Sequence, residues 1–219
     1  MDLALKQPSH NYTNAIETWY IAGNTLDAEC MSIICDALAY DRTVTELWLK
    51  RNPIKPNGSI HIQHLLTLNN TIVTLDLHNT GLLDEGFARV CEGLKANYTL
   101  QNLYVEANGI SDVSPIVTYF EQRGKLKQSI GVTDHGTDKV SISSLWIGMN
   151  PINDTGAILL CQCLEHISWL HGLYISSCGI SSIACNAIYT AFRQHPSLKV
   201  LDLGKLQGDI PCIITNYYN

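Results

Sequence analysis

The segment CQCLEH contains Cys161, Cys163 and His166, three side chains of the kinds that bind zinc. A zinc site needs these side chains to converge on one ion. In a helix, Cys161 and Cys163 point about 200° apart around the axis, so they cannot face the same ion. Cys161 also recurs at equivalent positions as Cys35 and Cys91, which is typical of residues that pack one helix against the next. We therefore predict no metal site.

The other residues that could perform catalysis are dispersed. Cys178 has no base placed beside it, and the histidines are spread along the chain. The sequence contains no glycine-rich phosphate loop, no paired-carboxylate constellation and no nucleophile motif. We therefore expect no enzymatic activity and no cofactor.

The chain carries eight cysteines, enough for several disulfides. Its opening segment, MDLALKQPSHNYTNA, lacks the basic start and apolar core of a signal peptide. We therefore expect the thiols to be reduced. For the same reason we interpret the glycosylation-type triplets as unmodified. These triplets begin at Asn11, Asn57, Asn97 and Asn153.

The composition is typical of a folded domain with a protein partner. Apolar residues make up 46% of the chain and charged residues 16%. The net charge of −6 weighs against nucleic acid or an anionic membrane as the main partner. No apolar run approaches the roughly 18 residues that a membrane span needs. We expect a cytoplasmic protein, or one in the cytosol of a host if it is a secreted effector.

The elements that would position these residues recur at a fixed spacing. In VTELWLKRNPI, apolar Val44, Leu47, Leu49 and Ile54 stand at positions one, four, six and eleven, with Asn52 at position nine. The pattern begins seven times, at residues 16, 44, 72, 100, 142, 170 and 198, so five of the six intervals are 28 residues and the fourth is 42. A fixed period of about 20–29 residues with this pattern is typical of leucine-rich repeats.

The second half of each repeat has a helical pattern. Position fifteen is always small, and positions nineteen and twenty-three are apolar in most repeats. A spacing of four residues places those two positions on one face of a helix. Polar residues at position twelve are expected to cap these helices. They are Asp27, Ser111, Asn153 and Ser181.

Each repeat is therefore expected to form a short strand, a turn and a helix. Neighbouring strands lie about 4.8 Å apart whereas helices are about 10 Å wide, so the stack must bend with the strands inside. The 28-residue unit, best seen in IVTLDLHNTGLLDEGFARVCEGLKANYT, resembles the ribonuclease-inhibitor-like class of leucine-rich repeats. The resemblance implies an α/β fold, a right-handed solenoid or horseshoe of about seven repeats, with a concave parallel sheet and convex helices.

The repeat domain is expected to span residues 16–205, between a cap or flanking segment at 1–15 and a tail or cap at 206–219. The fourth repeat carries an insertion at about 123–139, which we interpret as a surface loop of open role. The tail is too short for a full repeat. The last edge is therefore expected to be covered by the tail, by a second copy in a homodimer or by a longer parent chain.

Position five is expected to face out of the concave sheet, because strand side chains alternate. Five of the seven residues there are tyrosine or tryptophan. Either the rings stack on one another and merely cover the sheet, or they form a binding surface. We favour the second, since tryptophan and tyrosine dominate interface hot spots. The row consists of Tyr20, Trp48, Asp76, Tyr104, Trp146, Tyr174 and Asp202.

Polar groups beside this row are each typical of solvated surface when taken alone, and together they would orient a partner protein. The candidates are Lys50, His78 and Glu106 at position seven, with Arg51 and Met149 at position eight. The asparagines at position nine are interpreted as structural, because their amides can donate to and accept from the backbones of adjacent turns.

The sequence thus predicts a non-enzymatic scaffold that binds a partner protein through its concave face. A second hypothesis follows from the resemblance, because GTPase-activating proteins for Ran carry similar repeats, and Arg51 with Lys50 would then contact a regulated enzyme. A third is a eukaryotic-like bacterial effector acting on a host protein, and a fourth is a structural fragment of a larger protein.

Overall fold

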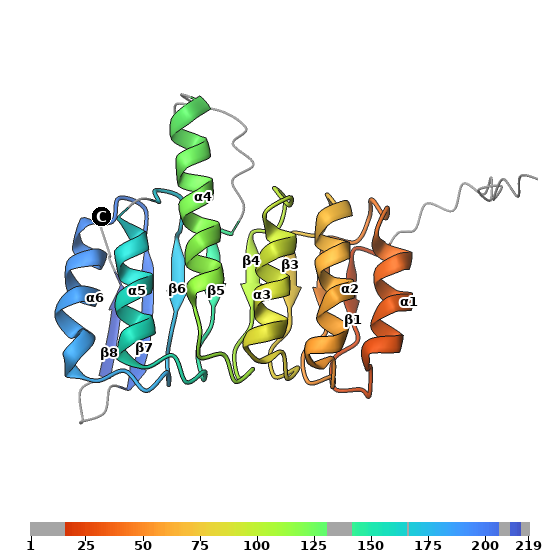
Figure 1. Ribbon diagram of the computed structural model, residues 1–219, viewed down its shortest axis with the longest axis horizontal. Coiled ribbons are helices and arrows are strands. Elements are labelled where there is room, and N and C mark those ends of the chain that lie inside the picture. The colour runs from red at the N-terminus through yellow and green to blue at the C-terminus, as the bar shows by residue number, and fades with distance from the viewer. Residues whose placement is uncertain (1–15, 131–141, 166, 206–210, 216–219) are drawn as a thin grey trace, which may run out of the picture.

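The computed structural model describes residues 16–130, 142–165, 167–205 and 211–215, which form one stack of strand–turn–helix units (Figure 1). The expected cap at 1–15, residues 131–139 of the insertion, and residues 206–210 and 216–219 of the tail lie outside the described residues. The strands are β1 Thr18–Tyr20, β2 Glu46–Trp48, β3 Thr74–Asp76, β4 Asn102–Tyr104, β5 Ser144–Trp146, β6 Gly172–Tyr174, β7 Val200–Lys205 and β8 Pro211–Thr215. The helices are α1 Ala28–Leu38, α2 Lys55–Leu68, α3 Leu83–Leu94, α4 Ser114–Ile130, α5 Asn153–Leu164 and α6 Ser182–Gln194.

The strands form a single open sheet in chain order from β1 to β8. Strands β1 to β7 are parallel, as predicted, and β8 from the tail adds an antiparallel strand that the sequence did not predict. The register aligns equivalent positions of successive repeats. Position five therefore forms one row, in which the paired residues are Tyr20, Trp48, Asp76, Tyr104, Trp146, Tyr174 and Asp202.

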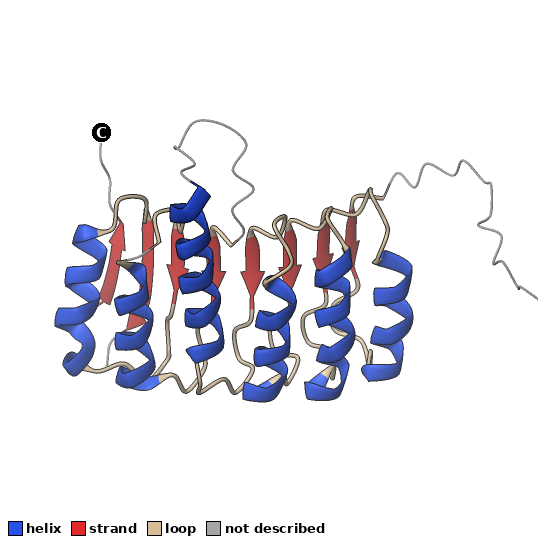
Figure 2. Cartoon of the chain, turned by 45° about the horizontal axis from the view of Figure 1, so that its top comes forward, coloured by secondary structure: helices blue, strands red, loops and turns tan. Residues whose placement is uncertain are grey.

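The described helices all lie against one face of the sheet and leave the other face open (Figure 2). Between the two layers lies a continuous apolar core built from the repeat positions. In the second repeat Val44, Leu47, Leu49 and Ile54 are all fully buried. Each unit buries its apolar side only against its neighbours, which is why the chain folds as an α/β solenoid. Ile16, which opens the first repeat, is 54% exposed because no described unit packs beyond it.

Asparagine amides at position nine connect successive turns, as predicted. The side chain of Asn52 accepts hydrogen bonds from the backbone N–H groups of Asn24 and Leu26, at 3.0 and 3.2 Å. The same amide donates to the carbonyl oxygens of Ile21 and Leu49. Buried backbone groups that the turn leaves unpaired thus find partners. Equivalent bonds are made by the buried side chains of Asn108 and Asn150.

A second amide ladder lies after the helices, and the sequence analysis missed it. Asn97 donates to the carbonyl oxygens of Leu66 and Asn69 at 2.9 Å each, and it accepts from two backbone N–H groups that follow it. Asn69 makes the same contacts one repeat earlier. One repeat later, the guanidinium of Arg123 donates to three backbone carbonyls, including that of Asn97. The repeated Asn spacing of 28 residues was the available signal.

The predicted helix caps are half right. Asp27 caps α1 and Ser181 caps α6, each accepting backbone N–H bonds in the first turn. The prediction is wrong for Asn153, which lies inside α5 with φ +57°. It is also wrong for Ser111, because Asp112 is the residue that accepts from the N–H of Ser114.

The first part of the insertion is helical, so its interpretation as a loop is wrong there. Helix α4 continues to Ile130 and is the longest described helix, with 17 residues (Figure 1). None of the described helices is long and apolar enough to cross a membrane.

Candidate functional site

Five rings on the open face of the sheet form a continuous row, which we call the aromatic ladder. The ring centroids of Tyr104 and Trp146 are 3.9 Å apart with an interplanar angle of 11°, and those of Trp146 and Tyr174 are 4.6 Å apart at 8°. Tilted contacts of 6.0 Å and 5.7 Å join Tyr20 to Trp48 and Trp48 to Tyr104. The rings therefore do stack on one another. They also stay accessible, since Tyr20 is 59% exposed and the other four are half-buried.

Asp76 interrupts the aromatic row and lies beneath it. Strand β3 lies between β2 and β4, yet the rings of Trp48 and Tyr104 approach to 5.7 Å across it. The short side chain of Asp76 leaves room for this contact, and the residue is only 2% exposed. The expectation that Asp76 faces solvent at position five is therefore wrong.

The carboxylate of Asp76 is held by two neighbours. One oxygen accepts a hydrogen bond of 2.8 Å from the backbone N–H of His78, and the other lies 4.0 Å from the ammonium of Lys50. Burial raises the pKa of Asp76, while the His78 N–H and the positive charge of Lys50 act in the opposite direction.

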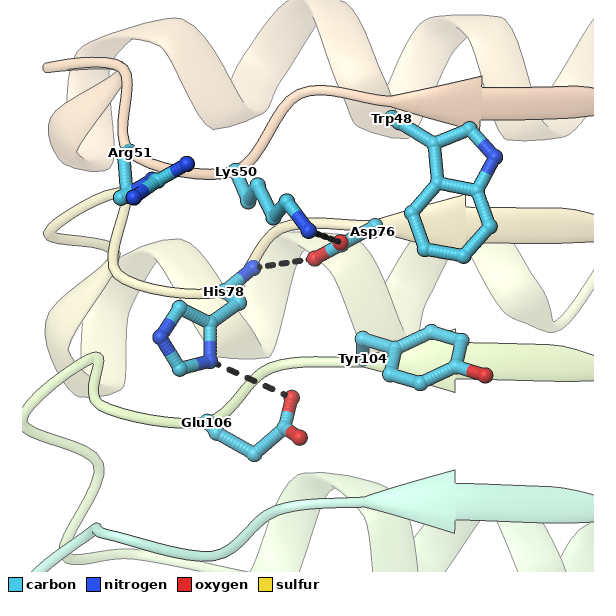
Figure 3. Close-up of a pocket in the computed structure, with 7 residues that line it drawn as sticks. All are labelled: Trp48, Lys50, Arg51, Asp76, His78, Tyr104 and Glu106. Carbon is cyan, nitrogen blue, oxygen red and sulfur yellow. Dashed lines mark hydrogen bonds and ion pairs between the residues drawn. The ribbon is translucent and has the colours of Figure 1, made fainter. Parts of the chain in front are cut away.

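A pocket of about 330 Å³ opens on this face where β2, β3 and β4 end (Figure 3). It brings together seven of the twelve residues predicted for the site. The turns after the strands create it, because Lys50, His78 and Glu106 each stand two residues past the end of a strand and therefore share one edge. The lining residues are Trp48, Lys50, Arg51, Asp76, His78, Tyr104 and Glu106.

Glu106 has an unusual environment in the pocket. The carboxylate oxygen Oε2 is buried and makes no hydrogen bond with any residue that the structure describes. The nearest cationic candidate, Nδ1 of His78, is 3.8 Å away, which is too long for a hydrogen bond (Figure 3). Burial raises the pKa of Glu106 to about 7, and the nearby negative charge of Asp76 adds to the effect. The pocket thus contains an acceptor whose charge changes near neutral pH.

The basic residues occupy the rim. The ammonium of Lys50 lies 5.2 Å from the ring centroid of Tyr20 and 5.5 Å from that of Trp48, within the range of cation–π attraction. Arg51 is exposed and has φ +58°. This left-handed conformation recurs at position eight, for example at Met149 with φ +54°.

The remaining predicted residues continue the face away from the pocket. Met149 is 49% exposed and stands three residues after Trp146, the last residue of β5. Asp202 ends the row, where it accepts a hydrogen bond of 2.8 Å from the N–H of Gly204. Tyr20, Trp146 and Tyr174 contribute rings but do not line the pocket.

Glu46 is a positioning residue that the sequence analysis missed. Its carboxylate accepts hydrogen bonds of 3.2 Å from the indole N–H of Trp48 and from the hydroxyl of Thr18. These bonds fix the indole of Trp48 in the aromatic ladder. Glu46 stands at position three of its repeat, where the repeat pattern has no characteristic residue.

The cysteines are packing residues where the structure describes them. Cys161 and Cys163 are each 3% exposed, and burial raises the pKa of both thiols to about 12. Such thiols are poor nucleophiles at neutral pH. The side chain of Cys178 lies 3.6 Å from the carbonyl oxygens of Ile147 and Ser176, so it takes the place of a position-nine asparagine. His166 lies outside the described residues, and within them no cluster of three ligand-type side chains surrounds a common point.

Comparison with known proteins places the repeats in context. No family model matches the chain. Over 242 residues it is 25% identical to the NACHT, LRR and PYD domains-containing protein 3 of Mus musculus, covering 89% of this chain and 23% of that protein. Over 106 residues it is 32% identical to a protein phosphatase 1 regulatory subunit 37 homolog of Caenorhabditis briggsae, covering 48% of this chain and 11% of that protein.

Among solved structures, an internalin from Listeria monocytogenes is 17% identical, with a TM-score of 0.25, and the match covers 88% of this chain and 68% of that one. The matched part of the chain spans 23% of the length of the protein from Mus musculus and 11% of that from Caenorhabditis briggsae. The 28-residue period folds as strand, turn and helix in one continuous sheet, which is the architecture of a solenoid of leucine-rich repeats, and the relative from Mus musculus carries LRR in its name.

Proposed function

We propose that the chain is a non-enzymatic scaffold that binds a partner protein through the open face of its sheet. The observation that carries the proposal is the aromatic ladder, whose rings stack on one another and still remain partly exposed. Contiguous exposed aromatic surface is rare on proteins without a partner, and tyrosine and tryptophan contribute most to interface energies. Solenoids present such extended surfaces to their partners.

The cysteines favour a reducing compartment for this scaffold. All seven cysteines whose side chains are described carry free thiols, and five of them are buried. Free thiols in this number persist most readily in the cytoplasm, which supports a cytoplasmic scaffold. A partner on the open face also fits the mixed polar rim formed by Lys50, Arg51 and His78.

A charge placed on the open face tests the proposal. Met149→Glu adds a carboxylate at an exposed residue three positions after Trp146 of the aromatic ladder, where arginine and asparagine adopt the same backbone conformation in other repeats. Proteins retained by the immobilised chain from cell extract are identified, and the affinity of the purified partner is then measured by calorimetry. We expect Met149→Glu to weaken binding by about tenfold or more, because the interface would bury an unpaired charge.

The matched control is Tyr40→Glu, because Tyr40 is 78% exposed and follows α1 on the helical side of the molecule. This variant should bind the partner as tightly as the unmodified chain. Loss of binding in Tyr40→Glu with normal binding in Met149→Glu would move the interface to the helices and reject the proposal.

Regulation of an enzyme is the second candidate function. It is favoured by the 32% identity, over 106 residues, to a protein named as a regulatory subunit of a phosphatase. Under this proposal the captured partner is itself an enzyme, and its turnover changes when the chain is added. Measuring the partner's activity with and without saturating chain tests this, and unchanged turnover would leave only the scaffold.

A further inference from the structure

We infer that the pocket at the ends of β2, β3 and β4 receives an arginine side chain of the partner, with the carboxylate of Glu106 as its acceptor. The inference rests on the proposed function, because it names the group by which a partner engages the same face. It is carried by the shape of the pocket and by an acceptor in it that lacks a donor.

The floor of the pocket needs a hydrogen-bond donor. Buried polar atoms are nearly always paired, and an unpaired one destabilises the fold. Asp76 already has the N–H of His78 and the ammonium of Lys50. Oε2 of Glu106 has no hydrogen-bond donor among the described residues, and Nδ1 of His78 lies 3.8 Å from it. The side chain of Glu106 is 17% exposed and lines the pocket, so a donor from a partner can approach the carboxylate through the pocket.

The walls of the pocket favour a planar cation. The rings of Trp48 and Tyr104 both line it, on either side of the buried Asp76 (Figure 3). A guanidinium stacks on aromatic faces while its N–H groups donate in its own plane. An ammonium is more strongly hydrated and donates from one point, so lysine uses these walls less well. The volume of about 330 Å³ is ample for one such side chain.

The charges around Glu106 leave room for one more cation. Lys50 lies against Asp76 and over the rings of Tyr20 and Trp48, on the far side of the pocket from Glu106. Arg51 is an exposed rim residue. On the opposite flank, position seven of the next repeat is Gly148, which brings no charge. An acidic ligand would instead meet the carboxylates of Asp76 and Glu106, and the chain as a whole carries a net charge of −6.

Arginine binding should be linked to proton release from Glu106. The groups that face this carboxyl are Asp76, His78, Tyr104 and, more distantly, Lys50. With a pKa of about 7, the ionised fraction of Glu106 rises from about one tenth at pH 6 to about nine tenths at pH 8. If only the ionised form binds, affinity for arginine rises about tenfold over this interval.

The test uses the full chain and N-acetyl-L-arginine amide as the probe, with binding followed by NMR at the indole N–H signal of Trp48. The neutral isostere N-acetyl-L-citrulline amide should bind at least about tenfold more weakly. Glu106→Gln should weaken arginine binding by about tenfold at pH 8 and abolish its pH dependence. The control Glu92→Gln changes an exposed carboxylate on α3 and should leave both unchanged.

Histidine side chains also change charge in this pH range, so the measurement is repeated with His78→Asn. In this variant the affinity for N-acetyl-L-arginine amide should still rise with pH, because Glu106 is unchanged. The inference would be overturned if the arginine probe does not bind, or if it binds equally well to Glu106→Gln. It would also be overturned if N-acetyl-L-lysine amide binds as tightly as the arginine probe or N-acetyl-L-glutamate amide binds more tightly. The proposed scaffold fails separately, because it is judged by partner binding to Met149→Glu and Tyr40→Glu.

Discussion

At the scale of single residues, the open face is built at some expense of stability. Glu106 keeps a carboxylate in a place where burial and the charge of Asp76 both oppose its ionisation. Residues that weaken a fold in this way are commonly those that a binding surface requires. The same reasoning does not extend to Asp76, whose carboxylate is paired.

Replacing Glu106 by glutamine should stabilise the free protein in alkaline conditions. The folded-state pKa of about 7 exceeds the ordinary value of 4.5, so the folded chain binds the proton more tightly than the unfolded chain. Stability from this group is complete below pH 4.5 and is lost as pH rises through 7. Urea denaturation should show Glu106→Gln more stable by about 1–3 kcal/mol at pH 8 and little changed at pH 4. An equal effect at both values would contradict the assigned environment of Glu106.

Sequence reasoning located the residues of the face but not their burial. Position five follows from the repeat period, because register fixes which residues share a row. Whether a ring leans over its neighbour depends on the size of that neighbour, and the burial of Asp76 results from two rings meeting above it. The unpaired oxygen of Glu106 likewise depends on distances that no periodicity contains.

At the scale of elements, the strands fix the spacing of the face and the turns after them carry its charged side chains. The three-residue strands β2, β3 and β4 align Trp48, Asp76 and Tyr104, and the following turns place Lys50 and Glu106 at one edge. The strand pattern was predictable from the spacing of leucines. The extension of α4 to Ile130 was not, because the 14 extra residues break the repeat period on which the prediction depended.

The aromatic ladder should be stabilising as well as accessible. Trp146 stacks on both Tyr104 and Tyr174, whereas Tyr20 ends the row with a single tilted contact. Trp146→Ala should therefore lower the free energy of unfolding by about 1–3 kcal/mol, and Tyr20→Ala by less than about 1 kcal/mol. Equal losses in the two variants, measured by urea denaturation, would show that stacking does not hold the row.

The second amide ladder should matter more to stability than its polarity suggests. Asn97 is 1% exposed and joins the backbones of successive repeats, so removing its amide leaves several buried groups unpaired. We expect Asn97→Ala to lower the free energy of unfolding by about 2–4 kcal/mol. Asn70→Ala, at an exposed neighbouring asparagine, should change it by less than about 0.5 kcal/mol. Equal losses of stability in Asn97→Ala and Asn70→Ala would show that the second amide ladder does not stabilise the fold.

At the scale of the whole molecule, the sheet has two different faces. Helices cover one face (Figure 2), and the other face carries the aromatic ladder and the pocket. Each repeat contributes one residue to the row, so the length of the binding surface grows with the number of repeats. A stack of repeats also has two ends, and the first repeat is incompletely covered, as the exposure of Ile16 shows. We propose that residues 1–15, a second copy or neighbouring repeats of a longer chain cover such edges.

Oxidative footprinting of the free chain and of its complex with the captured partner tests the binding face most directly. Hydroxyl radicals modify accessible tyrosine and tryptophan rings, and both faces of this molecule carry such rings. We predict several-fold protection in the complex at Trp48, Tyr104, Trp146 and Tyr174, with Tyr40 and Tyr189 on the helical side reacting as before. Protection of Tyr40 and Tyr189 with an unchanged aromatic ladder would contradict the account.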